Sequence, residues 1–299
     1  MPMVEAYGIA DEDAFATGLT CGGRLQVFVQ PMGGEYFPEF AEVAAAVDRD
    51  VPVAIATGIG AGFTSPARRL VWPAGALGSL GCPELDAAVD DDARGLLAQG
   101  VSGTREYGPR GERVLTERTV FVHSLAAPPR MLIFGAIDFA AAAARIGRFL
   151  GYRVTVCDAR ARFASHKRFP DADEVVVDWP HRYLARTEVD DRTVICVLTH
   201  DAKFDVPLLT LALRTRAGYV GAMGSRRTHV DRLAQLRKAG LTERELGRLH
   251  SPIGLDLGAR TPEKTAVSIA AELVQHRWGG TGRSLMTTDG PIHRAAAGH

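Results

Sequence analysis

The sequence lacks any hydrophobic run of the length, about 18 residues, that a membrane-spanning helix needs. Its start also lacks the basic segment and apolar core of a secretory signal. The chain also has no excess of charge of one sign, because Lys and Arg together number 35 and Asp and Glu together number 35. Binding to nucleic acid or to a membrane surface through bulk charge is therefore disfavoured, any anion site must be local, and we expect a cytoplasmic protein.

Cysteine is scarce, with 4 residues in 299 and no Cys-x-x-Cys or zinc-like spacing. Cys157 and Cys196 lie in apolar, strand-like runs, which predicts inert core thiols. Cys82, in Gly-Cys-Pro, is interpreted as a turn residue before a helix. Cys21 precedes two glycines and a strand. The residues alone leave two interpretations of Cys21 open, a partly buried turn residue or a functional thiol. The histidines show no ligand spacing, so a zinc site built by the protein is not expected.

What is present is the composition of a globular protein, 46% hydrophobic and 23% charged, in a length sufficient for two domains that each bury a core. The predicted boundary is Ala126-Ala127-Pro128-Pro129, because paired prolines continue neither a helix nor a central strand. Residues 1–127 are expected to form a small α+β domain and residues 128–277 a second domain. Residues 278–299, rich in Gly, Thr and Ala, are expected to be a loose tail.

Hydrophobic periodicity predicts the elements of both domains. In the first, we expect helices near 40–47 and 84–99 and strands at 25–29, 53–56, 69–72, 104–107 and 114–122. In the second, we expect strands at 131–134, 153–157, 174–177, 193–198 and 219–222, and helices at 139–150, 206–215, 228–239 and 261–275. This alternation predicts an α/β fold with a Rossmann-like parallel sheet and helices on both faces. Ligands of such sheets lie at the carboxyl ends of the strands, where Gly135, Asp158, His200 and Gly224 are expected to cluster.

The first strand-to-helix turn of the second domain departs from the G-x-G-x-x-G/A pattern of dinucleotide-binding proteins. Gly135 and Ala140 occupy the first and third positions, and Asp158 is the acidic residue expected about 20 residues further on. Ile137 stands where a second glycine would let the backbone touch a pyrophosphate, and Asp138 adds negative charge. Ordinary NAD(P) binding is therefore disfavoured, and Asp138 is interpreted as a helix-start residue that the helix dipole favours.

A second turn combines two glycines with two arginines. It contains Gly221, Gly224, Ser225, Arg226 and Arg227. Glycines allow close approach of a ligand, amides at a helix start bind anions, and arginine forks bind phosphate oxygens. The turn therefore predicts a phosphate site, and a solvated basic face is the alternative.

Other polar residues are expected at the same edge of the sheet. Arg260 directly precedes a helix that Thr-Pro is expected to start. His200 and Asp201 end a central strand, and they either supply a proton for chemistry or hold and cap neighbouring segments. Asp158 and Arg160 either contact a ribose hydroxyl and a phosphate, or form a surface ion pair of little energetic consequence.

Taken together, these motifs resemble the XdhC/CoxI family, the accessory factors of molybdenum hydroxylases such as xanthine dehydrogenase and carbon monoxide dehydrogenase. The segments that carry the resemblance extend over nearly the whole chain: 18–23, 27–31, 154–160, 199–201, 221–227, 252–262 and 266–272. The resemblance implies a cofactor-insertion chaperone rather than a turnover enzyme. Its cargo would be molybdenum cofactor, as molybdopterin or its dinucleotide form, delivered in a sulfurated state to an apo molybdenum hydroxylase.

The resemblance also assigns roles to residues and suggests further partners. Cys21 would contact molybdenum or its terminal sulfur, and His200 and Asp201 would serve any chemistry. The residues expected to bind the cofactor are Gly22, Gly23, Gly135, Asp158, Arg160, Gly221, Gly224, Ser225, Arg226, Arg227 and Arg260. A homo-oligomer is expected, and a cysteine desulfurase fits as a second partner, whereas nucleic acid and a membrane span are not expected.

Two departures from the family are visible in the sequence. Relatives carry a Gly-Ala-Gly-His type of turn where this chain has Gly135-Ala-Ile-Asp138, and they carry a further block with Gly-Gly-Cys before the Cys-Gly-Gly motif. We therefore expect either a short form or a start that lies further upstream. Two alternative functions stay open, namely an NAD(P)-dependent oxidoreductase on the same sheet and an interaction subunit without cofactor.

Overall fold

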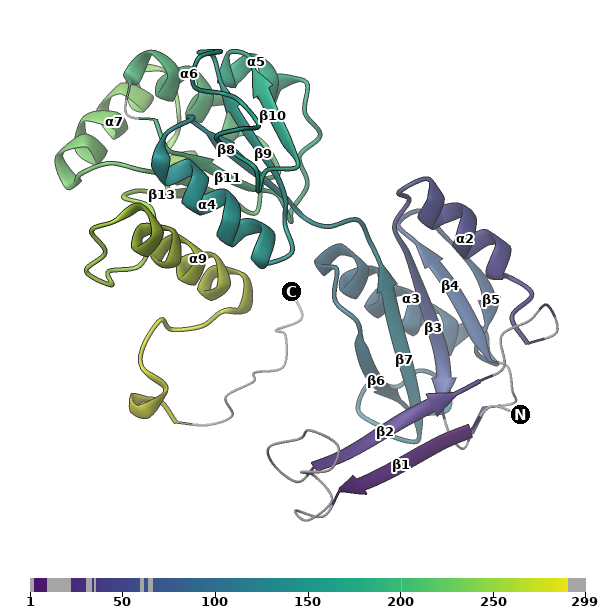
Figure 1. Cartoon of the computed structure of the whole chain (residues 1–299). Coiled ribbons are helices and arrows are strands. Elements are labelled where there is room, and N and C mark those ends of the chain that lie inside the picture. The colour runs from purple at the N-terminus through teal and green to yellow at the C-terminus, as the bar shows by residue number, and fades with distance from the viewer. Residues whose placement is uncertain are drawn as a thin grey trace. The chain divides into compact units, whose positions relative to one another are not determined.

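In the computed structural model the chain divides into two compact units, Met1–Ala127 and Pro128–His299 (Figure 1). The residues that can be described are 3–9, 23–30, 34, 36–59, 62–63, 67–199 and 201–289. Cys21, Gly22 and His200 lie outside them. Within the described residues, no helix has both the length and the apolar composition that crossing a membrane requires.

The N-terminal unit is built on a five-stranded antiparallel sheet in the order β5-β4-β3-β7-β6. Its strands are β3 (Val53–Ile59), β4 (Arg68–Trp72), β5 (Gly75–Ser79), β6 (Gly103–Tyr107) and β7 (Arg118–Leu125). A separate antiparallel pair is formed by β1 (Met3–Ile9) and β2 (Gly23–Val29).

Two helices cover opposite faces of the five-stranded sheet, α2 (Phe40–Asp48) and α3 (Pro83–Gln99). Because successive strand residues point to opposite faces, Val53 and its neighbour Ala54 belong to different cores. Val53 packs in the cluster that includes residues of α2, whereas Ala54 packs in the cluster of α3.

The C-terminal unit contains a six-stranded sheet in which every pairing is parallel. The strands, in spatial order, are β10 (Glu174–Val177), β9 (Arg153–Asp158), β8 (Arg130–Phe134), β11 (Val194–Val197), β12 (Tyr219–Ala222) and β13 (Leu249–His250). Counted along the chain from β8, this is the order 3-2-1-4-5-6 of a doubly wound nucleotide-binding fold. The predicted fold class is therefore confirmed.

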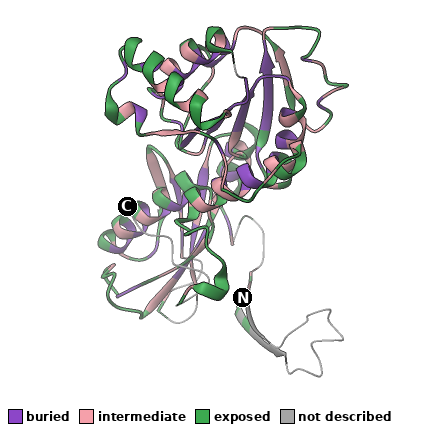
Figure 2. Ribbon diagram, turned by 90° about the vertical axis from the view of Figure 1, so that its left-hand side faces the viewer, coloured by how far each residue is buried: buried purple, intermediate pink, exposed green. Residues whose placement is uncertain are grey.

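Helices lie on both faces of this sheet. One face carries α4 (Asp138–Phe149) and α9 (Pro262–Trp278), which pack in one buried cluster with the strands. The other face carries α5 (Pro180–Ala185), α6 (Ala202–Ala212), α7 (Arg226–Lys238) and α8 (Glu243–Leu246). A short 3-10 helix, η2 (Leu285–Thr287), follows α9. Figure 2 shows burial concentrated on the central strands, while the helices expose their outer surfaces.

Some element boundaries differ from those expected. The strand expected at 114–122 begins later in the structure. Val114 is 90% exposed in a turn, and β7 starts at Arg118. The helix expected at 206–215 begins earlier, because Asp201 caps α6 by accepting a hydrogen bond from the Lys203 amide and Pro207 is accommodated inside the helix. Strands β1, β5 and β13 and helices α5 and α8 were not predicted.

Candidate functional site at the carboxyl edge of the parallel sheet

The carboxyl ends of the parallel strands bring several predicted residues to one edge. The strand order reverses between β8 and β11, which is the topological switch point where such folds bind ligands. The turn after β8 contains Gly135, β9 ends at Asp158, and the turn after β12 contains Gly224. Asp201, the N-cap of α6, follows β11 at this edge.

Gly135 lies where the two segments flanking the switch point touch. Its backbone has φ +110°, and a Cβ atom there would come within 2.7 Å of the Thr199 Cγ2 and 3.0 Å of the Thr199 amide nitrogen. A side chain at this position would clash with the chain that leaves β11. The glycine is therefore required by packing between two loops, independently of any ligand.

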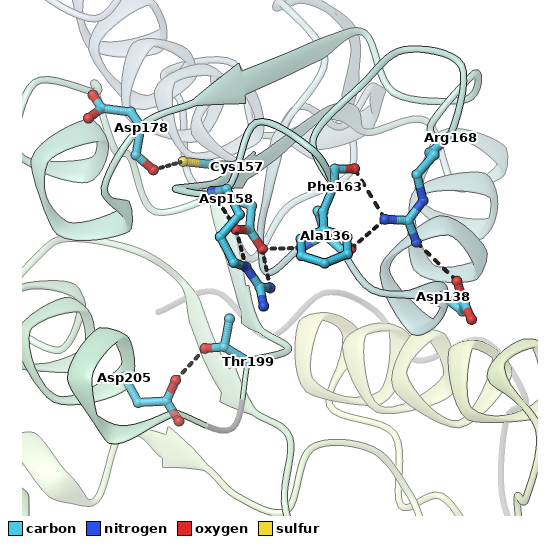
Figure 3. Close-up of polar contacts among 10 residues, drawn as sticks. Ala136, Asp138, Cys157, Asp158, Phe163, Arg168, Asp178, Thr199 and Asp205 are labelled. Carbon is cyan, nitrogen blue, oxygen red and sulfur yellow. Dashed lines mark hydrogen bonds and ion pairs between the residues drawn. The ribbon is translucent and has the colours of Figure 1, made fainter.

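Asp158 is a buried carboxylate whose hydrogen-bonding capacity is used inside the protein. It is 3% exposed and accepts hydrogen bonds from the Ala136 amide at 2.8 Å and from the Arg160 guanidinium at 2.8 and 2.9 Å (Figure 3). Burial by itself raises the pKa of Asp158, but the hydrogen bonds from Arg160 and from the Ala136 amide outweigh it, so the pKa lies below its ordinary value. The carboxylate of this ion pair is thus buried, whereas the Arg160 side chain is 47% exposed.

Arg168 holds the same turn from its other side. Its guanidinium donates to the Ala136 carbonyl at 3.1 Å, to the Phe163 carbonyl at 3.3 Å and to the Asp138 carboxylate at 3.2 Å (Figure 3). Asp138 is the first residue of α4, as its interpretation as a helix-start residue requires. Both polar groups of the Ala136 residue, its amide and its carbonyl, are therefore engaged by side chains of the chain itself.

The turn after β12 is arranged differently. Gly224 has φ +156°, and Ser225 caps α7 by accepting a hydrogen bond from the Thr228 amide at 3.1 Å. Arg226 and Arg227 occupy the first two helical positions with exposed side chains. Neither guanidinium has a hydrogen bond or ion pair to any residue in the described part of the chain. This helix start therefore exposes two positive charges that no residue of the described ranges neutralises.

The remaining predicted residues fall in three groups. Gly221 lies within β12, where a Cβ atom would come within 2.5 Å of the Ile253 side chain, so packing alone already favours a glycine there. Arg260 is exposed next to Thr261, the N-cap of α9. Gly23 begins β2, while Cys21, Gly22 and His200 belong to the part of the chain that is not described.

A buried ion pair that the sequence did not predict lies at the same edge. Arg232 and Asp205 are 4% and 3% exposed, and their side chains meet at 2.9 Å. Arg232 also donates to the Met223 carbonyl at 2.8 Å and to the Ser251 hydroxyl at 3.1 Å, and Asp205 accepts from the Thr199 hydroxyl (Figure 3). One arginine thus fixes the segments that follow β11, β12 and β13.

The described thiols fit the expectation of inert core cysteines. Burial raises the pKa of Cys157 and of Cys196 to about 12. Cys82 is half-buried at the N-cap position of α3. Among the described residues, no group of three or more His, Cys, Asp or Glu side chains could hold a metal ion.

Comparisons with known proteins agree with this fold. Residues 131–273 match the family of the XdhC Rossmann domain. A protein from Bacillus subtilis described as a probable xanthine dehydrogenase subunit is 28% identical over 164 residues, which cover 53% of this chain and 46% of that protein. The molybdenum cofactor insertion chaperone PaoD from Escherichia coli is 33% identical over 93 residues, which cover 31% of this chain and 29% of that protein.

A solved structure extends the likeness in fold. The crystal structure of a xanthine dehydrogenase from Bacillus halodurans superposes with a TM-score of 0.67 at 21% identity, covering 96% of this chain and 77% of that one. The chain matches about half, or less, of the length of the curated relatives.

Proposed function

The chain carries the Rossmann domain of the XdhC family, which confirms the resemblance read from its motifs, and on that premise we propose that it is a maturation factor for molybdenum hydroxylases. It binds molybdenum cofactor and delivers it to an apoenzyme of the xanthine dehydrogenase type. The names of two relatives, a molybdenum cofactor insertion chaperone and a xanthine dehydrogenase subunit, support this role.

The observation that carries the proposal is the start of α7. A single phosphate group there would accept hydrogen bonds from the Arg226 and Arg227 guanidinium groups and from amides that have no carbonyl partner within the helix. The helix dipole and Gly224 favour the same anion, and Arg260 is a further candidate contact. Cys21, by family resemblance, would contact molybdenum or its terminal sulfur, since a thiolate is a soft metal ligand.

Finer parts of the proposal rest on the family resemblance. They are delivery of a sulfurated cofactor, a cysteine desulfurase as second partner, self-association of the chain, action in the cytoplasm, and any chemical role of His200 and Asp201. An oxidoreductase function has no support from the first turn, where Asp158 already occupies the Ala136 amide. A carrier needs no turnover of its own, only a lower affinity for its cargo after it docks to the apoenzyme.

The test is the cofactor content of the purified protein. The full chain is isolated without oxygen from a host that makes molybdenum cofactor, and molybdenum and oxidised pterin are both quantified. We expect the two at near one per chain. The double variant Arg226→Ala/Arg227→Ala should retain less pterin than the wild type by a factor of about ten or more. It loses the hydrogen bonds from two charged groups to the phosphate, and such bonds contribute about 1.5–3 kcal/mol each. Cys21→Ser should retain less molybdenum.

Arg244→Ala is the matched control. Arg244 is an exposed arginine of α8, beyond the far end of α7, which is about 20 Å long. Its substitution should leave pterin retention unchanged. A wild-type protein that is empty in a cofactor-producing host would refute carriage and favour a cofactor-free interaction subunit.

A further inference from the structure

The turn between β8 and α4 is the position where a doubly wound fold normally holds the diphosphate of a dinucleotide. In this chain the anion at the turn is one of its own side chains. The Asp158 carboxylate accepts the Ala136 amide hydrogen bond at 2.8 Å and is almost fully buried. A diphosphate could bind this amide only by displacing a buried carboxylate.

The charges around the turn disfavour such a displacement. Both nearby arginines are already paired, Arg160 with Asp158 at 2.8 Å and Arg168 with Asp138 at 3.2 Å. The Asp138 side chain is 86% exposed at the first position of α4 and adds a negative charge beside the turn. An arriving diphosphate would therefore meet two carboxylates and no unpaired cation among these four side chains.

Space around the turn leads to the same conclusion. Ile137, a β-branched residue, stands at the N-cap position of α4, where a glycine would allow the backbone to touch a phosphate. The turn has little room to recede, because its backbone lies so near the chain that leaves β11 that a Cβ atom added at Gly135 would come within 2.7 Å of the Thr199 Cγ2. Its carbonyl side is held by Arg168 at Ala136.

We infer that Asp158, Ile137 and Asp138 close the first turn to a diphosphate, and that the chain therefore selects the single-phosphate form of the pterin cofactor over its dinucleotide form. The inference rests on the proposed function for the identity of the cargo. The pterin of the single-phosphate form ends in one phosphate, for which the start of α7 is sufficient. The dinucleotide form carries a diphosphate and a nucleoside, which the closed turn does not accept.

The test compares two probes on the full-length protein without oxygen: molybdopterin, and molybdopterin cytosine dinucleotide. Binding is measured by ultrafiltration and pterin fluorescence. We expect the wild type to bind molybdopterin at least tenfold more tightly than the dinucleotide. The variant Ile137→Gly/Asp138→Asn, altered at a half-buried and an exposed position, should reduce that ratio at least tenfold by gaining dinucleotide affinity.

Two further variants separate the inference from other outcomes. Ile137→Val keeps the β-branch and should keep the wild-type ratio. Asp158→Asn removes the buried charge at nearly constant volume and, where it folds, should act in the same direction as the double variant. Equal or tighter binding of the dinucleotide by the wild type would overturn the inference and leave the carrier function standing. Binding of neither probe would refute the carrier function, and the inference with it.

Discussion

Glu272 is a carboxylate on which several segments of the C-terminal unit converge. It accepts hydrogen bonds from the Tyr219 hydroxyl at 2.6 Å and the Gly254 amide at 2.5 Å, and it lies 3.1 Å from Nδ1 of His250. The Tyr219 and His250 rings stack with centroids 4.4 Å apart. This cluster joins α9 to β12, to β13 and to the segment that follows β13.

The protonation of Glu272 is coupled to folding. Burial by itself raises the pKa of Glu272, but the bonds from His250, Tyr219 and Gly254 outweigh it and hold the pKa below its ordinary value. A carboxyl whose pKa is depressed in the folded state stabilises the fold at pH values above its unfolded pKa of about 4.3. That stability is lost as the pH falls through the lower, folded-state value.

The first prediction concerns Glu272→Gln. Loss of the charge weakens three contacts of a side chain that is only 14% exposed, so the free energy of unfolding at pH 7 should fall by about 1–3 kcal/mol. The difference from wild type should shrink below about pH 4, where the wild-type carboxyl becomes protonated as well. Urea denaturation at several pH values measures both effects.

The exposed Glu188→Gln is its control and should change stability little at any pH. A loss for Glu272→Gln that is independent of pH would show that the contacts do not depend on the charge.

At the scale of elements, Arg232 is what connects the segments at the carboxyl edge. It lies on α7 and binds Asp205 on α6, the carbonyl that precedes Gly224, and the Ser251 hydroxyl after β13. The start of α7 is thereby fixed relative to α6. The proposed phosphate position at the start of α7 is thus held in place by Arg232, which lies on the same helix and is almost fully buried.

Arg232→Met should therefore be strongly destabilising. It leaves Asp205 buried without its cation, which typically costs about 3–5 kcal/mol in the free energy of unfolding. The double variant Asp205→Asn/Arg232→Met should be destabilised by less than the sum of the two single variants, because the uncompensated charge is gone. Urea unfolding measures all three.

Arg237→Met is the matched control, since Arg237 forms an exposed ion pair with Glu243 on the neighbouring helix α8. It should have little effect on stability. Additive losses in the Arg232 and Asp205 variants would show that the two side chains act independently.

The elements also show what could be predicted from the sequence. Buried parallel strands need apolar residues on both faces, so β8, β9, β11 and β12 appear as short apolar runs close to their observed bounds. β5 escaped prediction because its two glycines interrupt any such run. The predicted start of α6 was too late because a proline such as Pro207 usually marks the beginning of a helix. In the structure Asp201 caps the helix several residues earlier.

The candidate site could be predicted only in part, for a related reason. The glycine turns and the strand ends are local, and the order of elements places them at one edge. The partners are not local: Asp158 binds an amide 22 residues away, and Arg232 binds side chains 27 and 19 residues away. No spacing rule indicates such pairs, so neither the hydrogen bond from the first turn to Asp158 nor the role of Arg232 could be predicted. Ile137 and Asp138, which are local to the first turn, did indicate from the sequence that it disfavours a phosphate.

At the scale of the whole molecule, each unit contains its own hydrophobic cores. The clusters around α2 and α3 consist of residues before the boundary, and the two clusters around the parallel sheet consist of residues after it. Burial of apolar surface is the main stabilising contribution to folding, so each set of cores can stabilise its own unit. We therefore expect the units to unfold as separate cooperative transitions.

The corresponding prediction uses one variant in each unit. Arg69 forms a partly buried ion pair with Asp90 in the N-terminal unit, at 2.6 Å, as Arg232 does with Asp205 in the C-terminal one. In urea unfolding followed by far-UV circular dichroism, Arg69→Met should shift one transition and Arg232→Met the other, each leaving the second midpoint in place. A fragment of residues 128–299 should reproduce the transition that responds to Arg232. A single transition that both variants shift would show that the two units unfold together, and an unfolded fragment would show that the C-terminal cores are not sufficient for the stability of their unit.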